Sequence, residues 1–128
     1  MLVGTGIDLV EIPRIQRSME RYGDRFLDRV FTSREKTYCL RKRKAAESFA
    51  ARFAAKEAAA KALGTGIGYG VTWREIEVTR EAGGRPGLQF HGRANQIAEG
   101  LGVARASLSL THTGALAMAS VALEARAG

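Results

Sequence analysis

Two carboxylates, distant in the chain, are the residues best suited to metal chemistry. Asp8 lies near the end of an apolar N-terminal segment, and Glu57 lies in an alanine-rich stretch four residues before Lys61. If the two carboxylates converge, they supply two hard oxygen ligands that, together with water and phosphate oxygens, describe a magnesium site. Each also has an ordinary interpretation. Asp8 can cap a helix, and Glu57 can pair with Lys61 across one helical turn, which stabilises a helix by about 0.2–0.5 kcal/mol.

Small residues surround these charges. Ala54, Ala58 and Ala62 recur at every fourth position, so they share one helical face that lets another backbone, of a ligand or of a second subunit, come close. The alanine-rich stretch is followed by Gly64–Gly68, whose amides can approach a phosphate because glycine has no Cβ. This run follows a predicted helix and does not lead into one, so it is neither a P-loop nor a dinucleotide-binding fingerprint. A glycine C-cap with a flexible loop is the alternative.

Other candidates for acid–base or nucleophilic chemistry are few. His112 stands between Thr111 and Thr113, and a lone histidine is usually structural, although the flanking hydroxyls keep it a weaker candidate base. Cys39 is the only cysteine, so it forms no internal disulfide, which is consistent with a reducing cytosol. Two histidines and one cysteine argue against a structural zinc site.

The net charge of +7 is concentrated in the N-terminal half, where residues 1–63 hold fourteen Lys/Arg against eight Asp/Glu. An acidic partner or a polyphosphate is therefore expected to bind there. Arginines recur at three- and four-residue spacing and would form a ridge on one continuous helix, unless they merely line a solvated face: Arg14, Arg17, Arg21, Arg25 and Arg29. The run 41–44 suits either nucleic acid or a nucleotide phosphate. Aromatic residues make up only 7% of the chain and do not alternate with basic ones, which argues against an RNA-binding module.

The elements that must position these residues follow from composition and periodicity. Helices are predicted over residues 13–26, 33–41, 45–63 and 93–101, and strands over residues 1–10, 71–79, 88–91, 107–113 and 116–123. Ser33 is the expected N-cap of the second helix, and ten alanines without Gly or Pro make 45–63 the strongest helix. The pattern indicates an α+β fold with a mostly antiparallel sheet, in a single domain over residues 1–128. No apolar run approaches the roughly 20 residues of a membrane span, and the N-terminus does not resemble a signal peptide.

Three blocks together resemble the bacterial holo-acyl-carrier-protein synthase family: residues 4–11 with Arg14, residues 52–68, and residues 107–113. They occur in the family's order across essentially the whole chain. The resemblance implies the 4'-phosphopantetheinyl transferase fold, with the sheet packed on the long alanine-rich helix, and a trimer whose active sites lie between subunits. It also implies a cytoplasmic, Mg²⁺-dependent enzyme of fatty acid biosynthesis. Such an enzyme transfers 4'-phosphopantetheine from coenzyme A to a serine of apo-acyl carrier protein and releases adenosine 3',5'-bisphosphate.

The resemblance also assigns roles by position. Asp8 and Glu57 match the magnesium carboxylates, and Lys61 matches the lysine beside the transferred phosphate. Coenzyme A contacts are matched by Arg52, Gly64, Thr65, Gly66, His112 and Thr113, with Arg43 and Lys44 as looser candidates for its 3'-phosphate. The carrier-protein docking helix is matched by Arg14, Arg21 and Arg25.

The group that takes the serine proton stays open among Glu57, a water on the metal and His112. Two other hypotheses compete with the transferase: a small basic module that binds nucleic acid or an anionic surface, and a subunit that only assembles with a partner enzyme.

Overall fold

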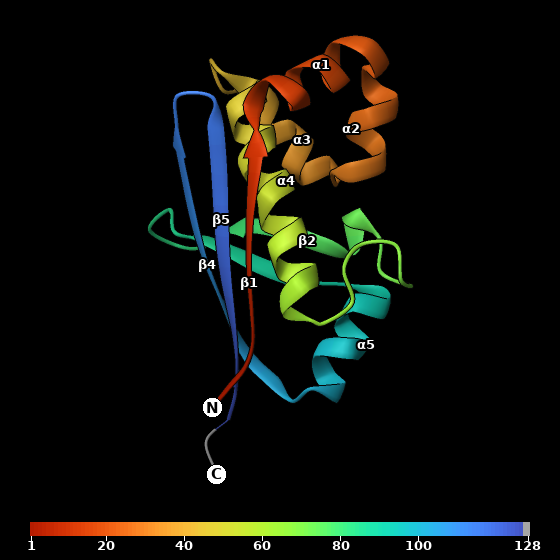
Figure 1. The fold of residues 1–128 in the computed structure, drawn as a ribbon, viewed down its shortest axis with the longest axis vertical. Coiled ribbons are helices and arrows are strands. Elements are labelled where there is room, and N and C mark those ends of the chain that lie inside the picture. The colour runs from red at the N-terminus through yellow and green to blue at the C-terminus, as the bar shows by residue number, and fades with distance from the viewer. Residues whose placement is uncertain (127–128) are drawn as a thin grey trace.

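The computed structural model describes residues 1–126 of the chain. Strand β1 (Leu2–Glu11) leads into four helices, α1 (Ile12–Tyr22), α2 (Asp24–Val30), α3 (Ser33–Leu40) and α4 (Ala45–Ala62). A short 3₁₀ turn, η1 (Trp73–Glu75), precedes the hairpin of β2 (Ile76–Arg80) and β3 (Pro86–Phe90). Helix α5 (Gly92–Gly100) then leads to the long hairpin of β4 (Val103–Thr113) and β5 (Leu116–Ala125). The strands form a three-stranded sheet in the order β1-β5-β4 and the separate β2-β3 pair, both antiparallel (Figure 1).

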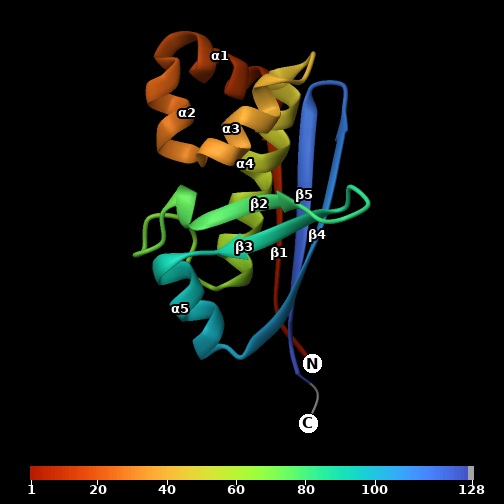
Figure 2. The same ribbon diagram turned by 180° about the vertical axis from the view of Figure 1, so that it is seen from behind.

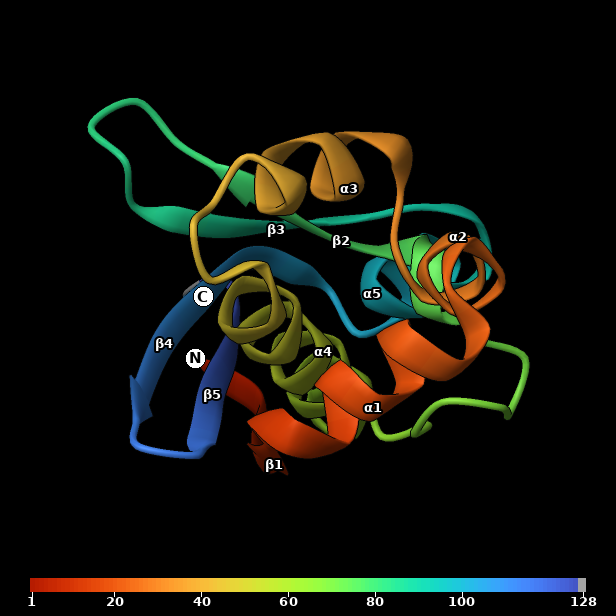
Figure 3. The same ribbon diagram turned by 90° about the horizontal axis from the view of Figure 1, so that it is seen from above.

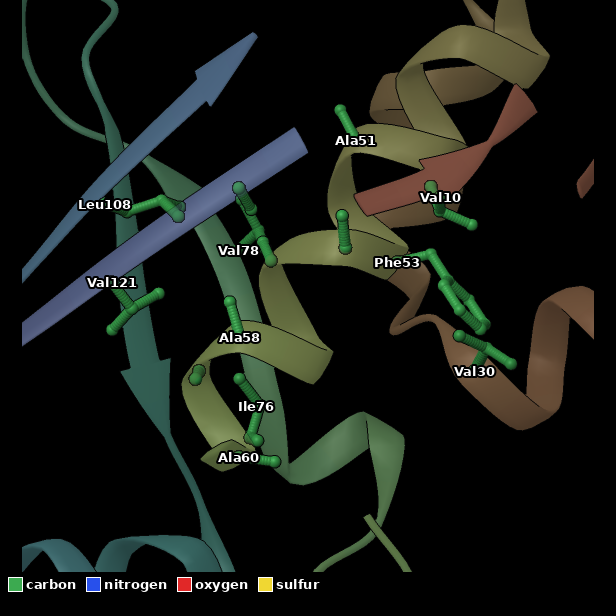
Figure 4. Close-up of a cluster of buried hydrophobic side chains, with 14 of the residues drawn as sticks. Val10, Val30, Ala51, Phe53, Ala58, Ala60, Ile76, Val78, Leu108 and Val121 are labelled. Carbon is green, nitrogen blue, oxygen red and sulfur yellow. The ribbon is translucent and has the colours of Figure 1, made fainter. Parts of the chain in front are cut away.

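Helix α4 is the centre of the molecule. It lies between the three-stranded sheet and the β2-β3 hairpin, while α1, α2 and α3 gather at one end and α5 lies at the other (Figures 2 and 3). Twelve of its eighteen residues are buried and eight of these are alanines, so neighbouring elements can approach the helix closely. Side chains from β2, β4 and β5 surround its alanines, for example Ile76, Leu108 and Val121 (Figure 4).

The three-stranded sheet has one covered face and one uncovered face. Residues alternate in direction along a strand, so Gly4, Gly6 and Asp8 point toward α4 while Ile7 and Leu9 point away. Ile7 and Leu9 are 60% and 58% exposed, and Met118 lies opposite Leu9 on β5. The uncovered face therefore presents a contiguous group of large apolar side chains.

The predicted α+β fold with antiparallel sheets is confirmed, but several local predictions are wrong, and the strand expected from residue 107 already begins at Val103. The helix expected over 13–26 ends at Tyr22, because Gly23 adopts a positive φ of 55° that breaks it, so the arginine ridge is divided between α1 and α2. The N-cap of α3 is Thr32 and not Ser33: its hydroxyl accepts from the amide of Glu35, whose carboxylate accepts from the amide of Thr32. The strand expected from residue 71 begins only at Ile76, because η1 precedes it.

None of the helices within residues 1–126 is both long and apolar enough to cross a membrane.

Candidate active site

Two glycines bring β1 into direct contact with α4. A Cβ added to Gly4 would lie 2.1 Å from the carbonyl oxygen of Ala62, and one added to Gly6 would lie 1.8 Å from that of Ala58. Both distances are far below van der Waals contact, so only glycine fits at either position. Ala58 and Ala62 do admit another backbone, as predicted, but it is the chain's own β1 and not that of a ligand or another subunit. Two glycines two apart on a strand and two alanines four apart on a helix permit this contact, but only the fold shows that they face each other.

This close contact places Asp8 beside Lys61. The Lys61 ammonium donates to Asp8 Oδ1 and to the carbonyl oxygen of Ile7, each at 3.1 Å. Asp8 therefore does not cap a helix: it lies within β1, and the residue at the N-cap of α1 is Glu11. Lys61 is paired with Asp8, and no ion pair joins it to Glu57 in the described part of the chain. Asp8 is thus neither a helix cap nor a turn residue, and Lys61 is not the partner of Glu57: the two residues join β1 to α4.

Glu57 lies on the same side of the contact. Burial, and then the negative charge of Asp8, raise the pKa of the Glu57 carboxyl, while Lys61 and Arg14 act in the opposite direction. Four charged groups therefore act on one another where β1, α1 and α4 meet. Two carboxylates that repel each other provide hard oxygen ligands for a divalent cation. Residues 1–126 contain no cluster of three or more His, Cys, Asp or Glu side chains, so a divalent cation bound here would need further ligands such as water or phosphate.

The glycine-rich loop begins within one turn of Lys61. Gly64, Gly66, Gly68 and Gly70 all have positive φ. The amide of Gly64 donates to the carbonyl of Lys61, and the amides of Thr65 and Gly66 both donate to that of Ala60. These bonds cap α4, as the C-cap interpretation predicted, so these three amides are already engaged. Contact of this loop with coenzyme A remains a prediction and would use its Cβ-free surface.

A second charged site, made of cations, lies on the flank of α4 opposite Glu57. Arg52, Arg80, Thr111 and His112 line a pocket of about 180 Å³, and Arg52 is only 4% exposed. The Arg52 guanidinium donates to the carbonyl of Ser48.

The guanidiniums of Arg52 and Arg80 and the ammonium of Lys42 lie 4.3, 5.0 and 4.5 Å from the centre of the Tyr38 ring. Burial alone would raise the pKa of the Tyr38 hydroxyl, but Lys42, Arg80 and Arg52 together lower it. Among the described residues no carboxylate lies within ion-pair distance of these three cations. The cluster therefore suits an anion. Arg80 and Tyr38 were not among the predicted site residues, because nothing in the residues near them indicates that β2 and α3 meet at Arg52.

The remaining predicted residues lie at two other places. Lys44 and Arg43 line a pocket of about 640 Å³ between α1 and the start of α4, and Glu47 borders both this pocket and the one that holds Arg52. Arg14 and Arg21 line a hollow on α1, and the Arg14 guanidinium lies 5.7 Å from the centre of the Phe53 ring. Arg25 follows the break at Gly23 and belongs to α2.

The two charged sites are separate within one chain. Asp8 is on β1 and His112 is on β4, with β5 between them. Two inter-strand spacings separate their backbones by roughly 10 Å across the sheet alone. One chain thus carries a carboxylate–lysine site and a cationic pocket that do not merge.

Comparison with known proteins identifies the family of the chain. The model of the 4'-phosphopantetheinyl transferase superfamily matches residues 4–118. The holo-[acyl-carrier-protein] synthase of Koribacter versatilis is 60% identical over 124 residues, covering 97% of this chain and 99% of the relative. The crystal structure of holo-[acyl-carrier-protein] synthase from Neisseria meningitidis is similar with a TM-score of 0.87 and 37% identity, over 97% of this chain and 99% of that one. The Helicobacter pylori enzyme in complex with coenzyme A has a TM-score of 0.83 at 29% identity, over 94% of this chain and 99% of that one. The chain therefore belongs to the 4'-phosphopantetheinyl transferase superfamily.

Proposed function

We propose that this chain transfers the 4'-phosphopantetheine arm of coenzyme A to a serine hydroxyl of apo-acyl carrier protein. The reaction releases adenosine 3',5'-bisphosphate and serves fatty acid biosynthesis in the cytoplasm. The observation that carries the proposal is the convergence of Asp8, Glu57 and Lys61 where glycines let β1 lie against α4. Such a transfer depends on positioning and on neutralising phosphate charge, which the Lys61 ammonium group can do directly and the two carboxylates by holding a cation.

Asp8 and Glu57 are the residues that would hold Mg²⁺. When bound, the cation supplies positive charge that stabilises the pyrophosphate as its bond to the departing nucleotide breaks. The residues fit this role, because a cation relieves the repulsion from Asp8 that helps to raise the pKa of Glu57. Lys61, held by Asp8, adds a second positive charge beside the site.

Among the chain's own groups, Glu57 is the best-placed general base. It lies among the charged groups where the phosphate of the substrate would bind, and a water held with the cation is the alternative acceptor of the serine proton. His112 lies on another strand, so it would reach the serine only from a neighbouring subunit.

We assign the cationic pocket of Arg52, Arg80 and His112 to a phosphate of coenzyme A. Its cations lack carboxylate partners among the described residues, and the similar Helicobacter pylori enzyme binds coenzyme A. Because this pocket and Asp8 are separate in one chain, the active site would form where the pocket of one subunit meets the carboxylates of the next. The uncovered apolar face of the three-stranded sheet supports the trimer that this arrangement needs.

The carrier protein would dock on α1 and α2. Arg14 and Arg21 are the docking residues of α1, and Arg25 that of α2. Arg14 also acts on the pKa of Glu57, so a docked acidic partner would lie beside the carboxylates.

The direct test is to incubate the protein with coenzyme A, Mg²⁺ and an apo-acyl carrier protein and to measure the mass of the carrier. We expect a gain of one phosphopantetheine that disappears when the cation is chelated. If none of several bacterial apo-acyl carrier proteins gains mass, the proposal is overturned. Asp8→Asn provides the matched inactive control, because it keeps the size of the side chain and removes its charge.

A further inference from the structure

Lys56 is a fully buried lysine that the proposed reaction does not use. It precedes Glu57 on α4 but points to the opposite side of the helix from Ala58 and Ala62, as 3.6 residues per turn requires. Its ammonium donates to Glu35 Oε1 at 2.8 Å, to the carbonyl of Ile76 at 2.6 Å and to that of Trp73 at 3.0 Å. All three of its donors are therefore engaged, each with a different partner.

The partner carboxylate is equally enclosed. Glu35 is 1% exposed, and its oxygens accept from the amides of Thr32 at 2.8 Å and of Val78 at 2.8 Å. Burial lowers the pKa of Lys56, and the charge of Glu35 opposes this change. An apolar pair of similar size often stabilises a core as well as a buried ion pair does. Stability alone therefore does not account for Lys56 and Glu35, whereas the geometry that their hydrogen bonds impose does.

The geometry concerns the glycine-rich loop, residues 63–72, which leaves α4 within one turn of Lys61 and within two turns of Glu57. The start of the loop is fixed to α4 by the amides of Thr65 and Gly66. Four glycines at positive φ give the loop little stiffness of its own. Within it, the amide of Gly68 donates to the carbonyl of Val71, whose side chain is buried, and the rest of its shape depends on the way each end is attached.

Lys56 is the attachment at the far end. Its bond to the Trp73 carbonyl ties the first residue of η1 back to the middle of α4, and the Trp73 ring packs on that of Phe53 with centroids 4.5 Å apart. Glu75 adds a second attachment, because it accepts from the amide of Thr72 and from that of Arg93 at the start of α5. The loop is thus closed on α4 at one end by backbone bonds and at the other by a buried ammonium group.

We propose that Lys56 is a positioning residue, which fixes the return of the glycine-rich loop onto α4 so that the loop, Glu57 and Lys61 share one rigid frame. The carbonyls of Trp73 and Ile76 fix the position of the ammonium group, while Glu35 balances its charge from α3. The consequence for catalysis rests on the proposed function, because it requires the loop to border the coenzyme A site.

The test compares Lys56→Met with Glu35→Gln. Lys56→Met removes the bond to Trp73, whereas Glu35→Gln weakens the pair and leaves Lys56 its two carbonyl partners. Amide hydrogen exchange over residues 66–73 reports the loop, and exchange in β5 reports the fold. We expect Lys56→Met to speed loop exchange about tenfold or more relative to β5, with Glu35→Gln close to wild type in this ratio. If Lys56→Met does not fold, the double variant Lys56→Met/Glu35→Gln carries no unpaired buried charge and gives the same comparison.

Activity supplies the second readout. We expect Lys56→Met to raise KM for coenzyme A about tenfold or more, while stabilisation of the protein by Mg²⁺ stays as in wild type. Loop exchange that rises no more than that of β5, or equally in both single variants, would overturn the positioning role. A wild-type protein without transferase activity would overturn the proposed function instead, and the exchange comparison would still decide the role of Lys56.

Discussion

Gly6→Ala should disable the site although it adds a single methyl group outside it. The new Cβ would lie 1.8 Å from the carbonyl oxygen of Ala58, and ordinary contact needs about 3.4 Å, so strand and helix must separate by roughly 1.6 Å. The obstacle is backbone, so no side-chain rotation relieves it. The same reasoning for Gly4→Ala, from 2.1 Å, gives a separation of roughly 1.3 Å.

Such a separation exceeds what the site tolerates. The Lys61–Asp8 contact of 3.1 Å would open, and the approach of Asp8 to Glu57 would be lost with it. A displacement of about 1 Å at a catalytic group costs about 100-fold in rate, so we expect kcat/KM for transfer to fall about 100-fold or more. Overpacking should also reduce the free energy of unfolding by about 1–3 kcal/mol. Steady-state transfer kinetics and thermal unfolding measure the two effects.

Gly100→Ala is the matched control. Gly100 ends α5, has no positive φ, and an added Cβ would meet no atom within 4 Å. We expect wild-type kinetics and a free energy of unfolding that is unchanged or higher by up to about 1 kcal/mol, because alanine is the better helix residue. Wild-type activity and stability in Gly6→Ala would refute the claim that direct contact between β1 and α4 sets the site.

Three further substitutions test separate parts of the site. Because the pKa of Glu57 is raised on folding, its ionised form destabilises the protein without Mg²⁺ above the ordinary pKa of 4.5. Glu57→Gln should therefore raise Tm at pH 7 without Mg²⁺, and this gain should vanish below about pH 4.5. The same substitution should remove the stabilisation of the protein by Mg²⁺. An unchanged response of Tm to Mg²⁺ would contradict the metal assignment. Arg80→Gln should raise KM for coenzyme A about tenfold or more with little change in KM for the carrier, and the reverse pattern would move the anion site elsewhere. Leu9→Asp places a charge on the uncovered sheet face and should convert a trimer to monomers in sedimentation, with loss of transfer, whereas a wild-type assembly would show that this face is not the interface.

The long helix and the chemistry-bearing residues could be predicted from the sequence, because both depend on local pattern. Ten alanines without glycine or proline specify the helix over 45–63, and α4 ends one residue earlier, at Ala62. Propensity could not show that Gly23 ends α1, since glycine is only mildly unfavourable within a helix and the break depends on its φ of 55°. That single angle divides the predicted arginine ridge between two helices.

The roles of Gly6 and Arg80 could not be predicted for a different reason. A glycine in a strand normally weakens it, and its value at Gly6 appears only when Ala58 is known to lie opposite. Arg80 and Tyr38 are far apart in sequence, and their meeting at Arg52 depends on how β2 and α3 pack on α4. Both features are properties of long-range packing.

Helix α4 shows how these properties combine in one element. One face carries Ala58 and Ala62, whose small side chains allow β1 to deliver Asp8; the opposite face carries Lys56, which holds the glycine-rich loop. Glu57 and Lys61 occupy the sector between them, so their directions are fixed from both sides. A helix with larger side chains on either face would move away from β1 or from η1. The Glu57 carboxylate would then be an ordinary surface group. The alanine content of α4 is therefore a requirement of the site as much as of the fold.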